Sequence, residues 1–157
     1  MRILVVGMGL IGGSICKSIK AATSHAVYGC DVQQAVLDDA IADGAIDGTG
    51  TMTDSTYDMI ILCLHQRIAI QMVQEALPKI PAGTILVDTC GLKGRMVRDL
   101  TYRCRKAGVR YVGTHPMAGR EKNGYYASIS NLFQNANLIV TPVDGTDEAA
   151  LDTVKEL

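Results

Sequence analysis

Residues 3–12 have the sequence ILVVGMGLIG, in which a short apolar run leads directly into a glycine-rich turn. The apolar run predicts a buried strand over residues 3–6, and the residues after the turn predict a helix over residues 11–21. The glycines fit GxGxxG, a pattern typical of dinucleotide-binding turns when it follows a strand and opens a helix. Six consecutive residues are the expected cofactor contacts: Gly7, Met8, Gly9, Leu10, Ile11 and Gly12.

Each glycine of the turn has its own physical task. Gly7 permits the tight turn, Gly9 lets the backbone approach a pyrophosphate, and Gly12 lets the helix pack closely on the strand. The helix N-terminus adds free N–H groups and the positive end of the helix dipole, both of which attract phosphate. The alternative is a glycine turn with a purely structural role.

Asp31 follows a second predicted strand, over residues 26–30. It lies about 20 residues after the glycine turn, where an acidic residue accepts hydrogen bonds from the ribose hydroxyls of a dinucleotide. A carboxylate there repels the additional phosphate of NADP, and the next residues, 32–34, are Val, Gln and Gln and supply no cation. The expected cofactor is therefore NAD, and the alternative is a solvated turn aspartate.

The rest of the chain alternates short Val- and Ile-rich runs with longer amphipathic stretches. Further strands are predicted at residues 59–64, 84–87, 109–112 and 137–141. Further helices are predicted at residues 33–42, 67–77, 95–106 and from 146 onward, with a polar loop over 113–131; Pro78 and Pro81 end the helix at 67–77. Strands that are apolar on both faces need helices on both sides. The predicted fold is therefore α/β, a doubly wound, mostly parallel sheet of the Rossmann type in one domain over residues 1–157.

The composition limits the classes of function. Of the 157 residues 48% are hydrophobic and 20% charged, as expected of a folded globular chain. A net charge of -1 gives no general attraction for nucleic acid or anionic membranes. No apolar run is long enough to cross a bilayer, and five cysteines without a CxxC motif fit reduced thiols, so we expect a cytoplasmic protein. The three histidines are far apart in the sequence, so no metal site is expected.

Residues 113–121, GTHPMAGRE, follow the strand predicted at 109–112. Ligands of open α/β sheets bind at the carboxyl ends of the strands. Pro116 disfavours a helical conformation for His115, and an imidazole can accept a proton near neutral pH. The alternative is a loop histidine with only a structural hydrogen bond. Two other strand ends add candidates: Leu64 and His65 on the adenosine side of the cofactor, and Thr89 beside the nicotinamide.

Several motifs, in order along nearly the whole chain, resemble the prephenate/arogenate dehydrogenase family: the glycine turn through Ser14, DTCGLK at 88–93, HPMAG at 115–119 with Glu121 and Gly124, Leu132-Phe133, and Thr141-Pro142. The HPMAG-x-E segment is far more specific than GxGxxG. The resemblance implies the nucleotide-binding domain of an enzyme that oxidises the hydroxyl carbon of a cyclohexadienol, passes hydride to NAD and releases the ring carboxylate as carbon dioxide. It assigns to His115 the hydrogen bond or proton of the ring 4-hydroxyl.

The chain departs from the family in two ways. Family members often carry a serine that assists the substrate hydroxyl where this chain has Gly91, so Thr89, a water or His115 alone must serve instead. The family's helical C-terminal dimerisation domain is also absent, and the chain stops within a predicted helix; we expect a fragment of a longer, homodimeric protein. The expected substrate-binding residues are Arg120, Glu121 and Lys122, with Lys93 as a further nearby cation.

Other interpretations stay open. The substrate is prephenate or arogenate, or the chain is another NAD-dependent hydroxyacid dehydrogenase, although β-hydroxyacid dehydrogenases are not expected to carry HPMAG-x-E. A non-catalytic NAD-sensing module is the non-enzyme alternative. Cys90 is disfavoured as a nucleophile because hydride transfer needs no covalent intermediate. The basic stretch over 93–110 is interpreted as a solvated helix face, and Tyr125-Tyr126 either cover the substrate or pack the loop.

Overall fold

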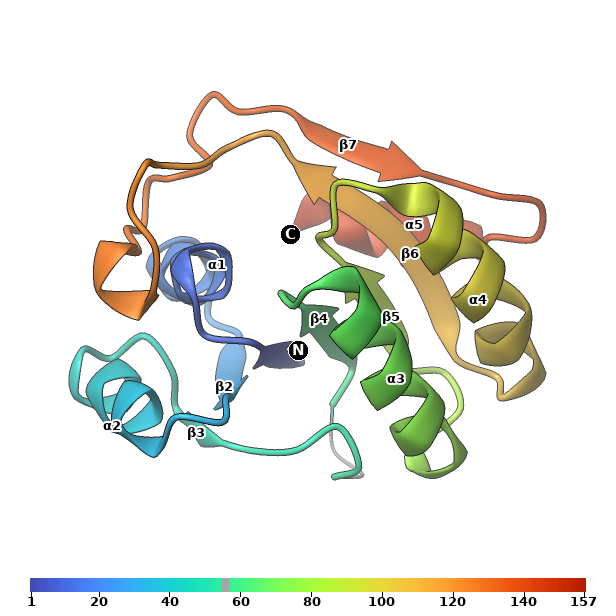
Figure 1. Ribbon diagram of the computed structural model, residues 1–157, viewed down its shortest axis with the longest axis horizontal. Coiled ribbons are helices and arrows are strands. Elements are labelled where there is room, and N and C mark those ends of the chain that lie inside the picture. The colour runs from blue at the N-terminus through green and yellow to red at the C-terminus, as the bar shows by residue number, and fades with distance from the viewer. Residues whose placement is uncertain (55–56) are drawn as a thin grey trace.

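The computed structural model describes residues 1–54 and 57–157, and within these ranges seven strands form one sheet (Figure 1). The strands are β1 (Arg2–Val6), β2 (Ala26–Cys30), β3 (Gly48–Thr49), β4 (Met59–Leu62), β5 (Ile85–Asp88), β6 (Arg110–Pro116) and β7 (Leu138–Thr141). Their order is β3-β2-β1-β4-β5-β6-β7. Neighbouring strands from β3 to β6 are parallel, whereas β7 is antiparallel to β6. This arrangement confirms the predicted doubly wound, mostly parallel sheet.

Helices cover both faces of the sheet. On one face pack α1 (Leu10–Ala22), α2 (Gln34–Ala42) and α5 (Glu148–Glu156), and on the other pack α3 (Gln66–Ala76) and α4 (Lys93–Lys106). Figure 1 shows α3 and α4 side by side, with α1 and α2 toward the opposite end of the sheet. All four residues of β4 are buried, as expected of a central strand with both faces covered.

The structure corrects several predicted boundaries. β3 was not predicted because its two residues form no apolar run. The predicted loop at 113–131 is wrong at its start, since β6 continues to Pro116 and places His115 in a strand. This extension depends on β7, which pairs Ile139 with His115 across the sheet and lies far along the chain. Helix α5 begins at Glu148, later than residue 146, because the Asp147 side chain caps it by accepting from the Ala150 N–H at 2.8 Å.

The loop after β6 returns to α1. Its short 3₁₀ helix η2 (Tyr125–Ala127) packs on α1, and the Ser18 hydroxyl donates to the Ser130 carbonyl at 2.7 Å. A side chain at Gly13 has no room at this contact, since its Cβ would lie 2.8 Å from both Ser128 Oγ and a ring carbon of Tyr125. Gly13 therefore serves the packing of the loop. Its neighbour Gly12 instead packs against the Gly7 carbonyl, in the turn directly after β1.

We expect Gly13→Ala to lower the free energy of unfolding by about 1–3 kcal/mol, because the added methyl group displaces buried Tyr125 and Ser128. Thermal or denaturant unfolding measures the change. Gly94→Ala is the matched control, because nothing beyond its chain neighbours and its own helix backbone lies within 4 Å of its added Cβ. Equal stability of the Gly13→Ala variant and the wild type would contradict the tight packing of η2 on α1.

Candidate functional site

The glycine turn lies where β1 meets α1 and has the geometry of an anion-binding turn. Gly7 has a φ of +92°, and a Cβ there would come within 2.5 Å of the Cys63 carbonyl oxygen. A Cβ on Gly12 would overlap the Gly7 carbonyl oxygen. Gly9, by contrast, faces open space, with nothing within 4 Å of an added Cβ. The turn is closed where it packs on the protein and open where a phosphate would approach.

Helix α1 begins directly after this opening. Its N-cap, Gly9, supplies no side-chain hydrogen bond, and its first turn contains no acidic residue. The first N–H groups of a helix have no intrahelical partner and carry the positive end of the helix dipole. Met8, Leu10 and Ile11 lie beside the opening in sequence, and the Met8 side chain is buried. Their contact with a cofactor stays a prediction. The residues present therefore fit the diphosphate of a dinucleotide.

Asp31 is both a candidate ribose ligand and a brace for the glycine turn. Its Oδ2 accepts from the Met8 N–H at 2.7 Å, and its Oδ1 accepts from the Gln33 N–H at 2.9 Å. A carboxylate has about four acceptor sites, so capacity remains for ribose hydroxyls. Val32 beyond it is 99% exposed and adds no charge. The bond to Met8 is a structural role that the sequence did not predict.

Leu64 and His65 follow β4 at the same edge of the sheet. The Leu64 side chain lies over Gly7, with a methyl carbon 2.8 Å from the position of an added Cβ. His65 is the exposed N-cap residue of α3. Leu64 thus lies against the glycine turn, and His65 opens the helix that follows β4.

The predicted reactive end brings together His115 from β6 with Thr89 and Gly91 from the turn after β5. His115 is half-buried, and its Nδ1 lies 3.4 Å from the Thr89 carbonyl oxygen. A carbonyl can only accept, so this contact favours the tautomer with the proton on Nδ1 and the lone pair on Nε2. A Cβ on Gly91 would lie 3.4–3.8 Å from three atoms of the imidazole ring. Gly91 therefore lies against the His115 ring.

Beneath this turn is a buried polar cluster that sequence reasoning missed. Asp88 has 0% exposure and accepts from the Tyr111 hydroxyl at 2.6 Å and from the Cys90 N–H at 2.9 Å. The Lys93 ammonium completes the cluster as an ion pair with Asp88. Burial, and then the neighbouring Asp88 carboxylate, raise the pKa of the Tyr111 phenol. The expected role of Lys93 as a substrate cation is corrected by this pairing, since its charge is neutralised inside the fold.

The loop after β6 carries the three predicted substrate-binding residues, and all three are exposed. Arg120 donates from Nη1 to the Ala127 carbonyl at 3.0 Å and so holds η2 in place. Glu121 and Lys122 follow it on the same loop. The guanidinium of Arg120 thus has a structural contact that the sequence did not predict.

The two tyrosines of the loop behave differently. Tyr125 is buried and donates to Asp43 at 3.0 Å, whereas Tyr126 is 77% exposed and donates to Asp39 at 2.5 Å. Both tyrosines anchor the loop to α2 or to the residue after it. Of the two interpretations left open by the sequence, these contacts favour packing of the loop.

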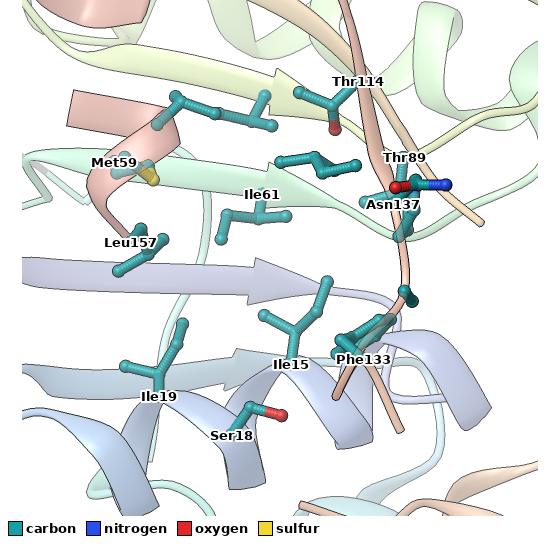
Figure 2. A pocket seen from close by; sticks show the side chains of 15 residues that line it. Ile15, Ser18, Ile19, Met59, Ile61, Thr89, Thr114, Phe133, Asn137 and Leu157 are labelled. Atoms are coloured by element: carbon teal, nitrogen blue, oxygen red, sulfur yellow. The ribbon is translucent and has the colours of Figure 1, made fainter. Parts of the chain in front are cut away.

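A separate apolar cavity of about 220 Å³ lies on the face covered by α1 and α5 (Figure 2). Ile15, Ile19 and Ile61 form part of its wall, and Leu157 lies at one end. Thr89 lies at the other end, toward which the strands point. The cavity shares Thr89 with the candidate site, but its wall suits apolar groups and not phosphates or carboxylates.

These features define a class: a Rossmann-type dinucleotide-binding domain with a histidine at the carboxyl edge of its sheet. The family model described as "Prephenate dehydrogenase, nucleotide-binding domain" matches residues 15–157, so the chain belongs to this family. The match confirms the family resemblance seen in the sequence.

Individual relatives agree with this assignment. Prephenate dehydrogenase of Bacillus subtilis (strain 168) is 31% identical over 99% of this chain, and cyclohexadienyl dehydrogenase of Zymomonas mobilis is 30% identical over 96%. The structure of prephenate dehydrogenase from A. aeolicus in complex with hydroxyphenyl propionate and NAD+ superposes with a TM-score of 0.89 at 30% identity, over 99% of this chain. Synechocystis arogenate dehydrogenase gives a TM-score of 0.88 at 26% identity, again over 99%. The chain spans 43% and 52% of the two sequence relatives and 55% of each structure.

In the described part of the chain, no helix has the length and apolar character needed to cross a membrane.

Cys90 lies beside the reactive end but is a poor nucleophile. Burial, followed by the nearby Asp88 carboxylate, raises the pKa of its thiol to about 11. Its Sγ donates to the Leu64 carbonyl at 3.3 Å. At pH 8 about one such thiol in a thousand is ionised, and the thiolate is the reactive form. This supports the view that Cys90 has no covalent role.

We expect the alkylation rate of Cys90 by iodoacetamide to rise about tenfold from pH 8 to pH 9, because the thiolate fraction rises tenfold per pH unit below the pKa. Peptide mass spectrometry of timed samples measures this rate, and urea-unfolded protein gives the reference for an ordinary thiol. A rate that is already constant above pH 8 would show that the thiol is activated.

Proposed function

We propose that this chain is the NAD-binding part of a dehydrogenase that converts prephenate to 4-hydroxyphenylpyruvate in tyrosine biosynthesis. The observation that carries the proposal is the orientation of His115, whose Nδ1 faces the Thr89 carbonyl and leaves Nε2 free to accept a proton. The A. aeolicus relative, a prephenate dehydrogenase in complex with NAD+, supports the choice of reaction and cofactor. Arogenate is the alternative substrate, and the Synechocystis relative supports it.

The proposed reaction balances with His115 as the base. Bound NAD+ supplies the hydride acceptor, and the carbon that bears the ring hydroxyl gives up the hydride. His115 Nε2 takes the hydroxyl proton as the C–O bond becomes a carbonyl. The bond from the ring to its carboxylate then breaks, and carbon dioxide leaves. The electron pair of that bond stays with the ring and makes it aromatic. The resulting phenolate takes a proton back, so the imidazole is neutral again at the end.

We propose that different residues bind different parts of the cofactor and the substrate. The glycine turn and the first turn of α1 hold the diphosphate, and Asp31 accepts from the ribose hydroxyls. Leu64 and His65 border the adenosine side, and Thr89 borders the nicotinamide. Arg120, Glu121 and Lys122 are proposed to border the substrate. Since the chain spans about half the length of its relatives, we propose that the whole protein is a homodimer with a further domain that completes the substrate site.

We expect Asp31→Ala to weaken NAD binding about 10- to 100-fold, because hydrogen bonds to a charged carboxylate are lost. The affinity for NADP should fall less, since the repulsion of its additional phosphate is also lost. Calorimetric titration with both nucleotides measures the two affinities. Asp38→Ala is the matched control, because it removes the same charge from an exposed position on α2. An unchanged NAD/NADP ratio would remove Asp31 from the proposed ribose site.

In the full-length protein, His115→Asn should lower kcat with prephenate about 10²- to 10⁴-fold, because the general base is lost. The Kd of NAD should stay within about twofold of wild type, since His115 is not among its proposed ligands. Steady-state kinetics and nucleotide titration measure the two quantities. His25→Asn is the control. It makes the same substitution outside the candidate site, at a ring whose Nδ1 lies 3.2 Å from the N-terminal amine. Wild-type turnover of His115→Asn would refute the base assignment.

A further inference from the structure

The buried carboxylate of Asp88 is held from two elements besides its own turn. Tyr111 from β6 donates to Oδ2 at 2.6 Å, and the Lys93 ammonium from α4 pairs with Oδ1. Lys93 is 14% exposed at its side chain, so this pair is largely shielded from water. An ion pair in such a place needs good geometry and further hydrogen bonds to offset the desolvation of its charges. The cluster is therefore a fixed point of the fold.

A single peptide group connects this fixed point to His115. The Cys90 N–H donates to Asp88 Oδ1 at 2.9 Å, and the carbonyl of the same peptide group, which belongs to Thr89, faces His115 Nδ1 at 3.4 Å. A peptide group is planar and rigid, and in the trans form its N–H and C=O point in opposite directions. Fixing the N–H on Asp88 therefore fixes the direction of the carbonyl that the imidazole meets.

The strands on both sides hold the same turn. The Thr89 N–H and hydroxyl both donate to the Leu62 carbonyl at 3.1 Å, and the Thr114 hydroxyl donates to the Asp88 carbonyl at 2.8 Å. These bonds fix the start of the turn, at the Asp88–Thr89 peptide group, to β4 and β6. The bond from the Cys90 N–H to Asp88 is the one that fixes the peptide plane facing His115.

We propose that Asp88 is a positioning residue for His115, acting through the Thr89–Cys90 peptide group, and that Tyr111 and Lys93 are positioning residues that hold the Asp88 carboxylate for this task. The inference rests on the proposed function, in which His115 is the base. The carboxylate, the peptide group and the imidazole form one chain of hydrogen bonds, in which each bond polarises the next. The chain keeps the proton on Nδ1 and presents the lone pair of Nε2 to the substrate.

The role is one of orientation more than of charge. A carboxylate that contacts an imidazole directly also stabilises the imidazolium that forms during proton transfer. Here Lys93 neutralises the charge of Asp88, and a peptide group separates the carboxylate from the ring. What remains is control over the tautomer and the direction of the ring. Because the Tyr111 phenol stays protonated, it remains a donor to Asp88 throughout the working pH range.

Tyr111→Phe tests the inference with the smallest change, since the ring stays in the core and one donor to Asp88 is lost. Tyr57→Phe is the matched control: both tyrosines are 7% exposed, and Tyr57 also donates to an aspartate, Asp54 at 3.5 Å. Asp88→Asn is a second test, because with little change of size it replaces one acceptor oxygen with a donor NH2, so the side chain can no longer accept on both sides. All variants are made in the full-length protein, with a melting curve for each.

The first measurement is the ¹⁵N NMR spectrum of the His115 ring, assigned with His115→Asn, at a pH where the ring is neutral. Wild type and Tyr57→Phe should show a protonated Nδ1 and an unprotonated Nε2. Tyr111→Phe and Asp88→Asn should show a mixture of both tautomers. The second measurement is kinetic: Tyr111→Phe should lower kcat about 10- to 100-fold, the range typical of residues that orient a reacting group, with the KM of NAD unchanged.

The outcomes separate this inference from the proposed function. Variants that melt at a lower temperature but keep the wild-type tautomer and kcat would make the cluster purely structural and overturn the inference. If wild type turns over neither prephenate nor arogenate while the tautomer still changes in Tyr111→Phe, the positioning role stands and the proposed reaction fails. If Asp88→Asn does not fold, the tautomer and kcat of Tyr111→Phe decide alone.

Discussion

The close approach of α1 to β1 and β4 is the constraint on which the rest of the site depends. It exists because Gly7 and Gly12 have no side chains: an added Cβ on the first would meet the Cys63 carbonyl, and on the second the Gly7 carbonyl. The approach fixes the direction of α1, so that its N-terminus points along the carboxyl edge of the sheet. The ends of β2, β4, β5 and β6 meet at the same edge because these strands are parallel to β1 or to one another. The candidate phosphate-binding turn and the candidate base are thereby placed on one rigid frame.

The same helix connects the two ends of the site by a second route. About one turn beyond its N-terminus, α1 packs against η2, and the Ile129 N–H donates to the Ser14 hydroxyl at 3.1 Å. Lys17 lies 4.6 Å from the centre of the Tyr125 ring and pairs with Asp43 at 3.4 Å. The loop that leaves β6 after His115 is therefore anchored on the helix that begins at the candidate cofactor site. Arg120 supports this arrangement from within the loop, because its guanidinium donates to the Ala127 carbonyl of η2.

The features that the sequence predicted are local ones. Three of them lie within one stretch of the chain: the strand at 3–6, the glycine turn and Asp31. In each case the local structure alone explains the residue types present. The features that it missed depend on partners far along the chain. Tyr111 and Asp88 are 23 positions apart, and neither has a sequence neighbour that reveals the bond between them. His115 was placed in a loop because Pro116 follows it, whereas pairing with β7 extends the strand through both residues. An exposed lysine and a buried, neutralised one also look alike in sequence, so the pairing of Lys93 needed the fold.

The glycine at position 91 makes the orientation of His115 by the backbone especially important in this chain. An added Cβ at this position would make ordinary contact with the ring, at 3.4 Å from Cε1 and 3.6 Å from Nε2. The space therefore accepts a Cβ, and a clash of that atom does not account for the glycine. With no side chain at 91, no hydroxyl from this position can hold the imidazole or the substrate oxygen. The ring makes its polar contact with the Thr89 carbonyl, 3.4 Å from Nδ1. In the proposed site, the direction of that carbonyl, and hence the peptide plane that Asp88 is proposed to fix, replaces a side-chain partner for the candidate base.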